Sequence, residues 1–378
     1  MKKRWQRKRL GDVLKVQNGY AFDSEGFNPT KGMPLIRIRS LKPGTETETH
    51  FDGDYDKKYV VKAGDLLIGM DGEFGCYEWK GEPALLNQRV CRLQGFSGEL
   101  IPRFLFYGVN DYLKAIEYVT GYATVKHISS KQILAIEFPI PPLDEQQRIV
   151  GLLDDAFEDL ATAQTNAEKN KQNARALFES YHNSIFKKRR KGWVEKPLGE
   201  VCEYVNGKAH EQCIDINGCF IVINSKFIST EGEIIKRSNE ALLLLQPGDI
   251  TMVLSDVPKG KALAKCFLVE KANTYTLNQR ICLLRSAHIH TKFLFYQLNR
   301  NKHFLSFDNG ENQTNLRLNQ VLSCPLFIPP ITEQETITNN LDAISEETKR
   351  LTSLYERKLV AVDALKKSLL NQAFTAEL

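Results

Sequence analysis

The sequence predicts an α+β protein with two tandem α/β domains, each followed by a long helix, and a coiled coil formed by the two helices with pseudo-two-fold symmetry. Three observations predict this fold: the second half of the chain repeats the first, each half begins with strand-like segments, and each half ends in a heptad pattern. The expected boundaries are residues 1–143 and 188–331 for the domains, and 144–187 and 332–378 for the helices.

The repeat is the most informative feature of the chain. Five segments recur in the same order at shifts of 188 to 191 residues: Leu10–Val13 with Leu198–Val201, Asn18-Gly19 with Asn206-Gly207, Leu86–Cys91 with Leu277–Cys282, Arg103–Tyr107 with Lys292–Tyr296, and Ile140–Gln146 with Ile328–Gln334. The near-constant shift indicates one duplication rather than a solenoid of many short repeats.

Length and composition exclude several classes of protein. The 378 residues are enough for two or three domains, and 42% hydrophobic with 26% charged residues is typical of a globular chain. We expect neither a membrane-spanning helix nor a secretory signal, and eight cysteines without a Cys-x-x-Cys pair favour reduced thiols in the cytoplasm. A net charge of +5 permits a nucleic-acid partner without requiring one.

The strands of each half are predicted from alternating or continuous apolar residues between turn signals. They are Pro34–Ser40, Leu66–Ile68 and Asn87–Leu93 in the first half, and Cys219–Ser225, Ile250–Leu254 and Asn278–Leu284 in the second. Cys91 and Cys282 occupy matching positions and are predicted to be small core residues. Gly19, Gly207 and the asparagines before them are predicted to form turns.

Each long helix is predicted to begin after a Pro-Pro pair, with Asp144 or Thr332 as N-cap and Glu145 or Glu333 in the first turn. The predicted apolar seams are Ile149, Leu153, Ala156, Leu160, Ala163, Ala167, Ala174, Leu177 and Tyr181, and Ile337, Leu341, Ile344, Leu351, Tyr355, Val362, Leu365 and Leu369. Asn170 and Lys358 interrupt the two seams at equivalent positions. They either fix register and partner choice or face a wetter part of the coil.

Basic residues are concentrated at two places. Six of the first nine residues are basic, and the first helix ends in Lys187-Lys188-Arg189-Arg190-Lys191. Cations at a helix C-terminus interact favourably with its dipole, but five in succession exceed what a cap needs. A phosphate backbone would relieve their mutual repulsion, so this run is a candidate for DNA contact.

Base contacts are expected where the two halves differ. The loop Thr124–His127 aligns with Asn312–Asn315, and Gly69–Gly75 aligns with Lys259–Lys265. Asn and Gln pair with adenine edges, Lys with guanine and Thr with the thymine methyl group, whereas solvated hairpins are the alternative for such loops. The candidate DNA-binding residues are Arg39, Lys42, Thr124, Lys126, His127, Lys187, Lys188, Arg189, Arg190, Lys259, Lys261, Gln313, Thr314 and Asn315.

Motifs for chemistry are missing from the sequence. Gly260-Lys261 lacks the upstream glycine and the hydroxyl residue of a phosphate-binding loop, and no Gly-x-Gly-x-x-Gly opens a helix. The Pro-Pro pairs follow Ile, so they do not form the Asn-Pro-Pro-aromatic motif of adenine methyltransferases. His288 and His290 would share one face of a strand without further ligands, so no metal site is expected. We therefore expect no catalysis and no cofactor in this chain.

The order of these motifs resembles the specificity subunit of type I restriction–modification enzymes. The resemblance covers the whole chain and is carried by the Leu-Gly-Asp-Val and Asn-Gly openings, the Leu-Asn-Gln-Arg segments and, above all, the Pro-Pro-x-x-Glu-Gln motif at the head of each helix. Glu335 stands where the first copy has Gln147, a small departure, because Glu145 and Glu333 match.

The resemblance implies that each half is a target recognition domain reading one part of a bipartite site on double-stranded DNA. It further implies an antiparallel coiled coil that separates the domains and docks methyltransferase subunits, which we expect in two copies and with S-adenosylmethionine bound to them. A restriction endonuclease subunit is a further candidate partner, and no membrane is involved. Two diverged domains on a rigid spacer suit a site made of two different half-sequences, and they would present equivalent docking faces to a symmetric pair of partners.

Two other functions remain open from the sequence. A coiled-coil scaffold whose α+β domains bind proteins is the main alternative, and salt-dependent DNA binding would separate it from a DNA-binding subunit. An enzyme with unrecognised nuclease chemistry is disfavoured, because no carboxylate cluster repeats in both halves.

Overall fold

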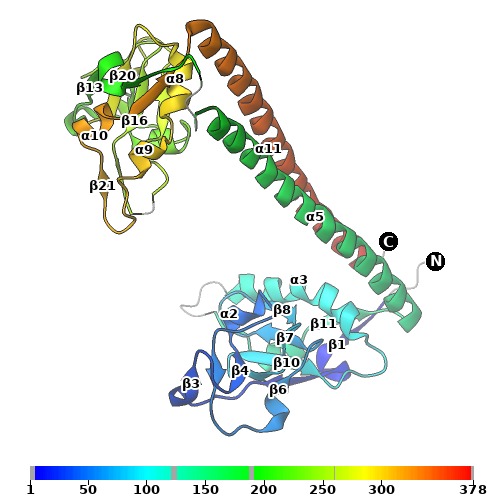
Figure 1. The fold of residues 1–378 in the computed structure, drawn as a ribbon. Coiled ribbons are helices and arrows are strands. Elements are labelled where there is room, and N and C mark those ends of the chain that lie inside the picture. Colours follow the sequence, from blue (N-terminus) through cyan, green and yellow to red (C-terminus); the bar gives the residue numbers. More distant parts are fainter. Residues whose placement is uncertain (1–4, 121–125, 187–190, 259, 376–378) are drawn as a thin grey trace. The chain divides into compact units, whose positions relative to one another are not determined.

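The computed structural model describes residues 5–120, 126–186, 191–258 and 260–375 (Figure 1). Its contacts divide the chain into two compact units, residues 1–167 with 357–378 and residues 168–356. Each unit therefore combines one α/β domain with one part of each long helix, α5 (Leu143–Phe186) and α11 (Ile331–Phe374).

The strands of the first unit form three sheets. In order, these are β1 (Gln6–Arg9) with β11 (Glu137–Ile140); β2 (Lys15–Asn18), β10 (Val90–Gln94), β7 (Leu66–Gly69) and β8 (Gly75–Glu78); and β3 (Phe27–Asn28), β5 (His50–Phe51), β4 (Met33–Ile36), β9 (Ala84–Leu86) and β6 (Val60–Val61). Only β4 and β9 pair in parallel; every other pair of these strands is antiparallel.

The second unit repeats the two-stranded and the four-stranded sheet of the first, but its third sheet has three strands and a further pair of short strands is present. Its sheets are β12 (Val194–Pro197) with β22 (Pro325–Ile328); β13 (Glu203–Asn206), β20 (Ile281–Arg285), β16 (Ile250–Val253) and β18 (Cys266–Leu268); β15 (Arg237–Ser238), β14 (Phe220–Ile223) and β19 (Tyr275–Leu277); and β17 (Ser255–Asp256) with β21 (Thr314–Asn315). The parallel pair β14–β19 corresponds to β4–β9, as the duplication predicts.

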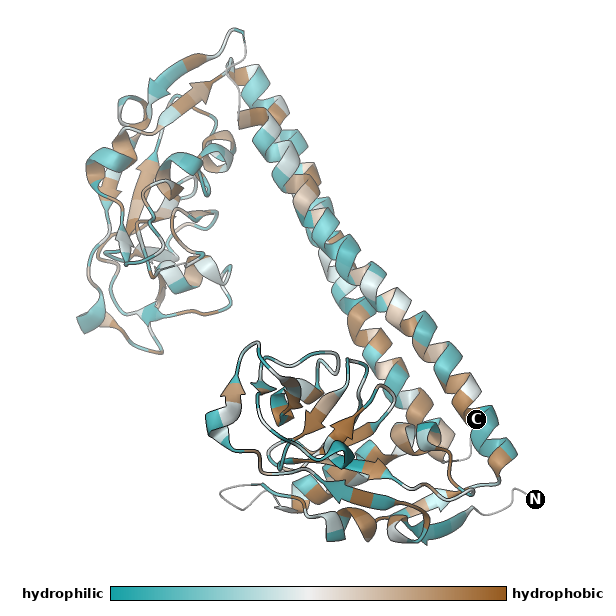
Figure 2. Ribbon diagram, turned by 60° about the horizontal axis from the view of Figure 1, so that its bottom comes forward, coloured by the Kyte–Doolittle hydropathy of each residue, from teal (hydrophilic) through white to brown (hydrophobic). Residues whose placement is uncertain are grey.

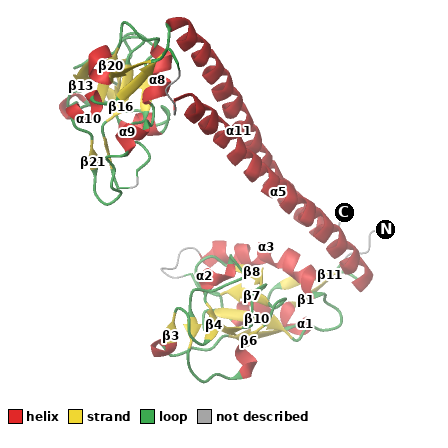
Figure 3. Ribbon diagram, in the orientation of Figure 1, coloured by secondary structure: helices red, strands yellow, loops and turns green. Residues whose placement is uncertain are grey.

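Helices surround the sheets of each unit (Figure 3). The first unit has α1 (Leu10–Val13), α2 (Ile38–Leu41), α3 (Pro102–Thr120) and α4 (Ser130–Leu134), with 3-10 turns at Ser24–Gly26 (η1) and Lys57–Tyr59 (η2). The second has α6 (Leu198–Val201), α7 (Ser225–Ser229), α8 (Thr291–Leu298), α9 (Lys302–Leu305) and α10 (Leu318–Leu322), with a 3-10 turn at Glu211–Cys213 (η3). None of the described helices is both long and apolar enough to cross a membrane.

The central sheets supply much of each core, and their strands are among the most hydrophobic segments in Figure 2. Cys91 on β10 and Cys282 on β20 are fully buried at matching positions, opposite Asn18 and Asn206 respectively. Burial raises the pKa of the Cys91 thiol to about 12, so it stays protonated and apolar. The prediction that both cysteines are core residues is confirmed.

The repeated Leu-Gly-Asp-Val segment is a short helix in both units. The Leu10 amide on α1 donates to the Ile136 carbonyl after α4, and the Leu198 amide on α6 donates to the Cys324 carbonyl after α10, both at 2.9 Å. Each glycine of the motif packs closely on the partner helix, since a Cβ atom at Gly199 would lie 3.1 Å from that of Leu322. The motif therefore docks two short helices together.

The Asn-Gly and Leu-Asn-Gln-Arg motifs contact each other. The Gly19 amide donates to the Val90 carbonyl at 2.9 Å, and a Cβ atom at Gly19 would lie 2.0 Å from the carbonyl oxygen of Asn87. Gly207 stands in the same relation to Asn278, also at 2.0 Å. The prediction that these glycines serve as turn formers needs correction, because they are required by close backbone approach and not by a left-handed conformation.

Several predicted element boundaries also need correction. The strands predicted to reach Ser40 and Ser225 end at Ile36 and Ile223, because α2 and α7 begin immediately afterwards. The Asn224 side chain caps α7 by accepting from the Phe227 amide at 2.9 Å.

The strands predicted to start at Asn87 and Asn278 begin three residues later, at Val90 and Ile281. In each case the asparagine carbonyl accepts a hydrogen bond from the amide of that first strand residue, which closes a turn. His288 and His290 lie beyond the end of β20 rather than on a strand, and His290 precedes the first residue of α8.

The two long helices are antiparallel within each unit. In the second unit, Lys171 contacts Glu356 at 2.8 Å, and the Thr348 hydroxyl donates to the Ala174 carbonyl at 3.4 Å, so positions rise along α5 as they fall along α11. In the first unit, Lys366 donates to the Gln164 side chain at 3.0 Å. The predicted pairing of the helices is confirmed.

Details of the predicted seams and caps differ from the structure. Ala163, Leu177 and Leu365 are exposed, although the heptad pattern placed them in the seams. Asn170 and Lys358 are exposed as well, which favours the wetter-position interpretation of these polar residues. Both helices begin one residue earlier than predicted, so Asp144 and Thr332 lie in the first turn rather than at the N-cap.

We predict that Gly19→Ala and Gly207→Ala each lower the free energy of unfolding by about 1–3 kcal/mol, because the added methyl group overlaps a backbone carbonyl. Gly151→Ala on α5 is the matched control. It meets no atom within 4 Å and should stabilise the helix by about 0.5–1 kcal/mol. Urea unfolding of the three variants tests the difference, and unchanged stability of Gly19→Ala and Gly207→Ala would contradict the close approach.

Candidate nucleic-acid interface

A buried glutamine attaches each α/β domain to the head of its long helix. Gln146 is fully buried and donates to the carbonyls of Glu99 at 2.7 Å and Pro141 at 2.8 Å, while its side-chain oxygen accepts from the Ile101 amide at 2.9 Å. Gln334 repeats the arrangement, donating to Pro329 and accepting from the His290 amide, both at 2.8 Å. Because a buried amide is costly unless all its polar atoms are bonded, these contacts define one geometry of attachment.

An aspartate two helical turns further along makes a second attachment. Asp154 on α5 accepts from the Arg103 guanidinium at 2.8 and 2.9 Å and from the Tyr107 hydroxyl, both on α3. Asp342 on α11 accepts from Lys292 and from the Tyr296 hydroxyl on α8, each at 2.7 Å. In both units, the first and last residues of the repeated sequence Arg/Lys-Phe-Leu-Phe-Tyr therefore bond the α/β domain to the long helix.

The two loops predicted to contact bases meet each other in the first unit. Asp71 and His127 form an isolated antiparallel bridge, and the Gly72 amide donates to the Lys126 carbonyl at 3.1 Å. The His127 Nδ1 atom lies 2.6 Å from an Asp71 carboxylate oxygen, and the other oxygen is 3.3 Å from Arg89. Backbone and side-chain contacts therefore join the loop after β7 to residues 126 and 127, which precede α4.

In the second unit the corresponding segments pair as β17 and β21, where Ser255 pairs with Asn315 and Asp256 with Thr314. Because β17 lies before Lys259, the predicted alignment of Gly69–Gly75 with Lys259–Lys265 needs correction: Ser255 stands where the first unit has Asp71. Gln313 donates to the Ser255 hydroxyl at 2.9 Å, and Thr314 donates to Asp308 at 2.9 Å. Gln313 and Asn315 remain exposed. The same two loops thus meet in both units, but they carry different side chains.

The remaining described candidates differ in their electrostatic surroundings. Lys42 pairs with Glu73 at 2.6 Å and Lys126 pairs with Glu117 at 2.9 Å, so acidic neighbours offset both charges. Arg39 is exposed and reaches the Thr49 hydroxyl at 3.3 Å. Lys261 is exposed next to Ala262, whose amide donates to Asp256. Thr124, Lys187, Lys188, Arg189, Arg190 and Lys259 lie outside the described residues.

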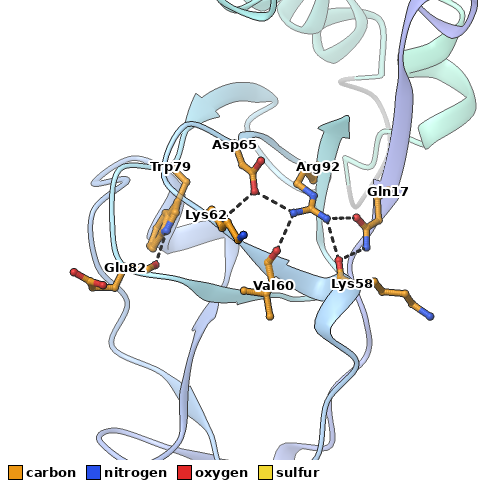
Figure 4. A network of polar contacts seen from close by, with 8 residues as sticks. All are labelled: Gln17, Lys58, Val60, Lys62, Asp65, Trp79, Glu82 and Arg92. Atoms are coloured by element: carbon orange, nitrogen blue, oxygen red, sulfur yellow. Dashed lines mark hydrogen bonds and ion pairs between the residues drawn. The ribbon is translucent and has the colours of Figure 1, made fainter. Parts of the chain in front are cut away.

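A half-buried arginine joins four strands of the first unit through a network of polar contacts (Figure 4). Arg92 on β10 donates to the carbonyls of Val60 at 2.8 Å and Lys58 at 2.9 Å, and to the side chains of Asp65 at 3.0 Å and Gln17 at 2.6 Å. Asp65 also accepts from the Lys62 amide, which closes the turn before β7. The network therefore fixes β2, β6, β7 and β10 relative to one another.

In the second unit, a different arginine contacts the aspartate of the turn that corresponds to the turn before β7. Leu283 replaces Arg92 on the strand, and Arg285, two residues further on the same face, reaches the buried Asp249 at 2.8 Å. Sequence reasoning missed both arginines, since only their contacts distinguish them from exposed cations. It also missed Arg37 and Arg89. Arg89 approaches Arg37 and Arg39 because β4 pairs in parallel with the distant strand β9.

Comparison with known proteins shows that the chain is similar to a family model and to individual specificity subunits. A family model, the type I restriction modification DNA specificity domain, matches the chain twice, over residues 2–171 and 190–357. The EcoBI specificity subunit of Escherichia coli is 39% identical over 166 residues, which cover 44% of this chain and 35% of that protein. The MjaVIII specificity subunit of Methanocaldococcus jannaschii is 23% identical over 99% of this chain and 93% of its own length.

Solved structures confirm the predicted fold. A chain from a structure of complex assembly and conformational transition of the type I restriction–modification system matches with a TM-score of 0.74, at 18% identity and 98% coverage of both chains. The HsdS subunit of Thermoanaerobacter tengcongensis matches with a TM-score of 0.59, at 16% identity, over 100% of this chain and 98% of that chain.

We predict that Asp342→Asn destabilises the second unit in a pH-dependent way. Burial raises the pKa of Asp342, but hydrogen bonds from Lys292 and Tyr296 outweigh burial and hold the pKa below its ordinary value. The carboxylate therefore stabilises the fold above its ordinary pKa, and this contribution is lost as the pH falls through the lowered pKa.

Thermal unfolding of Asp342→Asn should show a loss of about 1 kcal/mol at pH 7 that shrinks as the pH falls below the ordinary pKa of an aspartate. Exposed Glu346 on the same helix gives the control variant Glu346→Gln, for which little change is expected. A loss in Asp342→Asn that is independent of pH would contradict a role for the carboxylate charge.

Proposed function

Because the chain belongs to the type I restriction–modification DNA specificity family, we propose that it directs a type I complex to a two-part DNA sequence, each part read by one α/β domain. The specificity subunit is the non-catalytic part of such a system. The observation that carries the proposal is the contrast within the repeat: both domains are attached to their helices by equivalent contacts, whereas their paired loops carry different side chains.

The proposed target recognition domains comprise residues 1–143 and 188–331, and the proposed spacer helices comprise 144–187 and 332–378. Recognition of a bipartite target requires the same attachment in both domains and different loops. Each half-sequence can then change independently while the protein framework stays constant. The 44-residue helices α5 and α11 supply the constant part.

In the second domain we propose that Gln313, Thr314, Asn315 and Lys261 face the DNA. Exposed amide side chains at Gln313 and Asn315 suit adenine edges in the major groove. In the first domain, Lys126 and His127 occupy the equivalent place, with Thr124 next to them in sequence. Lys42, Lys259 and the run Lys187–Arg190 are proposed phosphate contacts, which would give binding a steep dependence on salt.

The helices are proposed to dock methyltransferase subunits, in two copies, and a restriction endonuclease subunit where one is present. Exposed leucines support this: Leu177 on α5 is 63% exposed and Leu365 on α11 is 48% exposed, and the two occupy equivalent positions of the repeat. Matched apolar positions on a duplicated framework suit two identical partners. S-adenosylmethionine would bind the methyltransferase, and the complex would act on DNA in the cytoplasm.

We predict that the purified chain alone neither methylates nor cleaves DNA. Together with an adenine methyltransferase subunit, it should direct N6-adenine methylation at one bipartite sequence, because recognition and catalysis reside in different chains. Methylome sequencing of a host carrying both genes measures this. Methyl transfer by the chain without a partner, or methylation without sequence preference, would overturn the proposal.

Methylome sequencing also tests whether the loop Asn312–Asn315 contacts bases. Gln313→Ala and Asn315→Ala should relax discrimination at particular base pairs of one half-target by about 1–3 kcal/mol, the scale of a bidentate base contact. Glu335→Gln, at an exposed helix position, is the control. Equal weakening on all sequences would place these two side chains on the phosphate backbone instead.

A further inference from the structure

A cleft of about 570 Å³ opens in the first unit beside the turn of the Leu-Asn-Gln-Arg motif. Three arginines from two segments line it, Arg37 and Arg39 at the start of α2 and Arg89 in the turn. Gln88 adds an exposed amide, and Phe22 contributes part of an apolar wall. The cleft therefore combines cationic donors with an aromatic surface in one concave site.

Two of these arginines differ from the other candidate cations of this unit. Lys42, Lys126 and Arg89 each contact a carboxylate, at 2.6, 2.9 and 3.3 Å respectively. Among the described residues, no carboxylate forms an ion pair with Arg37 or Arg39. Both side chains are exposed, so their donors are available to a ligand that is rich in acceptors.

The guanidinium groups of Arg37 and Arg39 are held in place before any ligand arrives. Arg37 lies over the Phe27 ring at 6.0 Å from its centroid, and Arg39 donates one hydrogen bond to Thr49 at 3.3 Å. Each contact leaves most of the five guanidinium donors unused. Restraint of this kind lowers the entropy lost when a planar guanidinium forms a bidentate contact.

The repeat separates the three arginines into two groups. Arg89 recurs as Arg280 in the second unit, also exposed, within the same Leu-Asn-Gln-Arg turn. Arg37 and Arg39 do not recur, because Asn224 and Lys226 occupy the equivalent positions at the start of α7, and Asn224 uses its side chain as a helix cap. A residue shared by both domains cannot distinguish two half-targets, whereas residues found in only one domain can.

We propose that Arg37 and Arg39 read guanine in the half-target of the first domain, with Arg89 contacting a backbone phosphate at the edge of the same cleft. Arginine forks match the O6 and N7 acceptors of guanine in the major groove, which is the commonest specific contact between proteins and DNA. This inference rests on the proposed function and specifies it further, because it states the base content of one half-target and the residues that read it.

The test uses the full chain in complex with its methyltransferase subunit. The complex selects duplexes from a random-sequence pool, and the bound fraction is sequenced for wild type, Arg37→Ala, Arg39→Ala and Arg89→Ala. Lys62→Ala is the charge-matched control, because Lys62 is exposed in the turn before β7, at the opposite end of that strand from Asp71. Circular dichroism verifies that each variant is folded.

The wild-type complex should select a bipartite site with guanine in one half. Arg37→Ala and Arg39→Ala should each reduce the preference for a guanine in that half by roughly 5- to 140-fold, and leave the other half unchanged. Arg89→Ala should weaken binding to all sequences and lower the slope of log affinity against log salt by about one. Lys62→Ala should behave as wild type.

Three results separate the possible failures. Absence of any selected bipartite sequence in the wild-type complex would overturn the proposed function itself. A bipartite site whose halves both lack guanine would overturn only the guanine inference. Equal weakening on all sequences in Arg37→Ala and Arg39→Ala, with restoration by Arg37→Lys and Arg39→Lys, would also overturn it, because a phosphate contact needs charge and not a planar fork.

Discussion

The structure depends on how each α/β domain is fastened to the head of a long helix. Gln146 and Gln334 are buried amides whose donors and acceptors are taken up by the backbone of the domain and of the Pro-Pro segment. Leaving such a group unbonded costs about 1–3 kcal/mol, so the attachment has one favourable geometry rather than a range. Asp154 and Asp342 reinforce it with hydrogen bonds from the domain to the helix.

This fastening is consistent with the proposal that one framework serves two specificities. The motifs that recur in both halves either bring two backbone segments together or attach the domain to its helix. Gly19 with Asn87 and Gly207 with Asn278 are examples of the first kind. The side chains that differ lie on the paired loops, where Asp71 meets His127 in one unit and Ser255 meets Gln313 in the other. Because the contacts between domain and helix are made elsewhere, the proposed base-reading loops can vary without changing how the domain is attached.

The sequence predicted the duplication, the long helices, the buried cysteines and the family, because each is carried by local pattern or by spacing along the chain. It placed Leu177 and Leu365 in the seams, since the heptad pattern alone does not show which side of a helix faces its partner. It also omitted Arg37 and Arg89 from the candidate site. Their proximity arises from the parallel pairing of β4 with β9, which joins segments about fifty residues apart and leaves no local signal.

The central claim is that the two domains are interchangeable readers on equivalent attachments. It is tested most directly by replacing residues 193–330 with a second copy of residues 5–142, followed by methylome sequencing with the methyltransferase subunit. If the domains are interchangeable, methylation should occur at a symmetric site made of two inverted copies of the first half-target. A folded, active complex that still methylates the original asymmetric sequence would show that the domains do not determine the target.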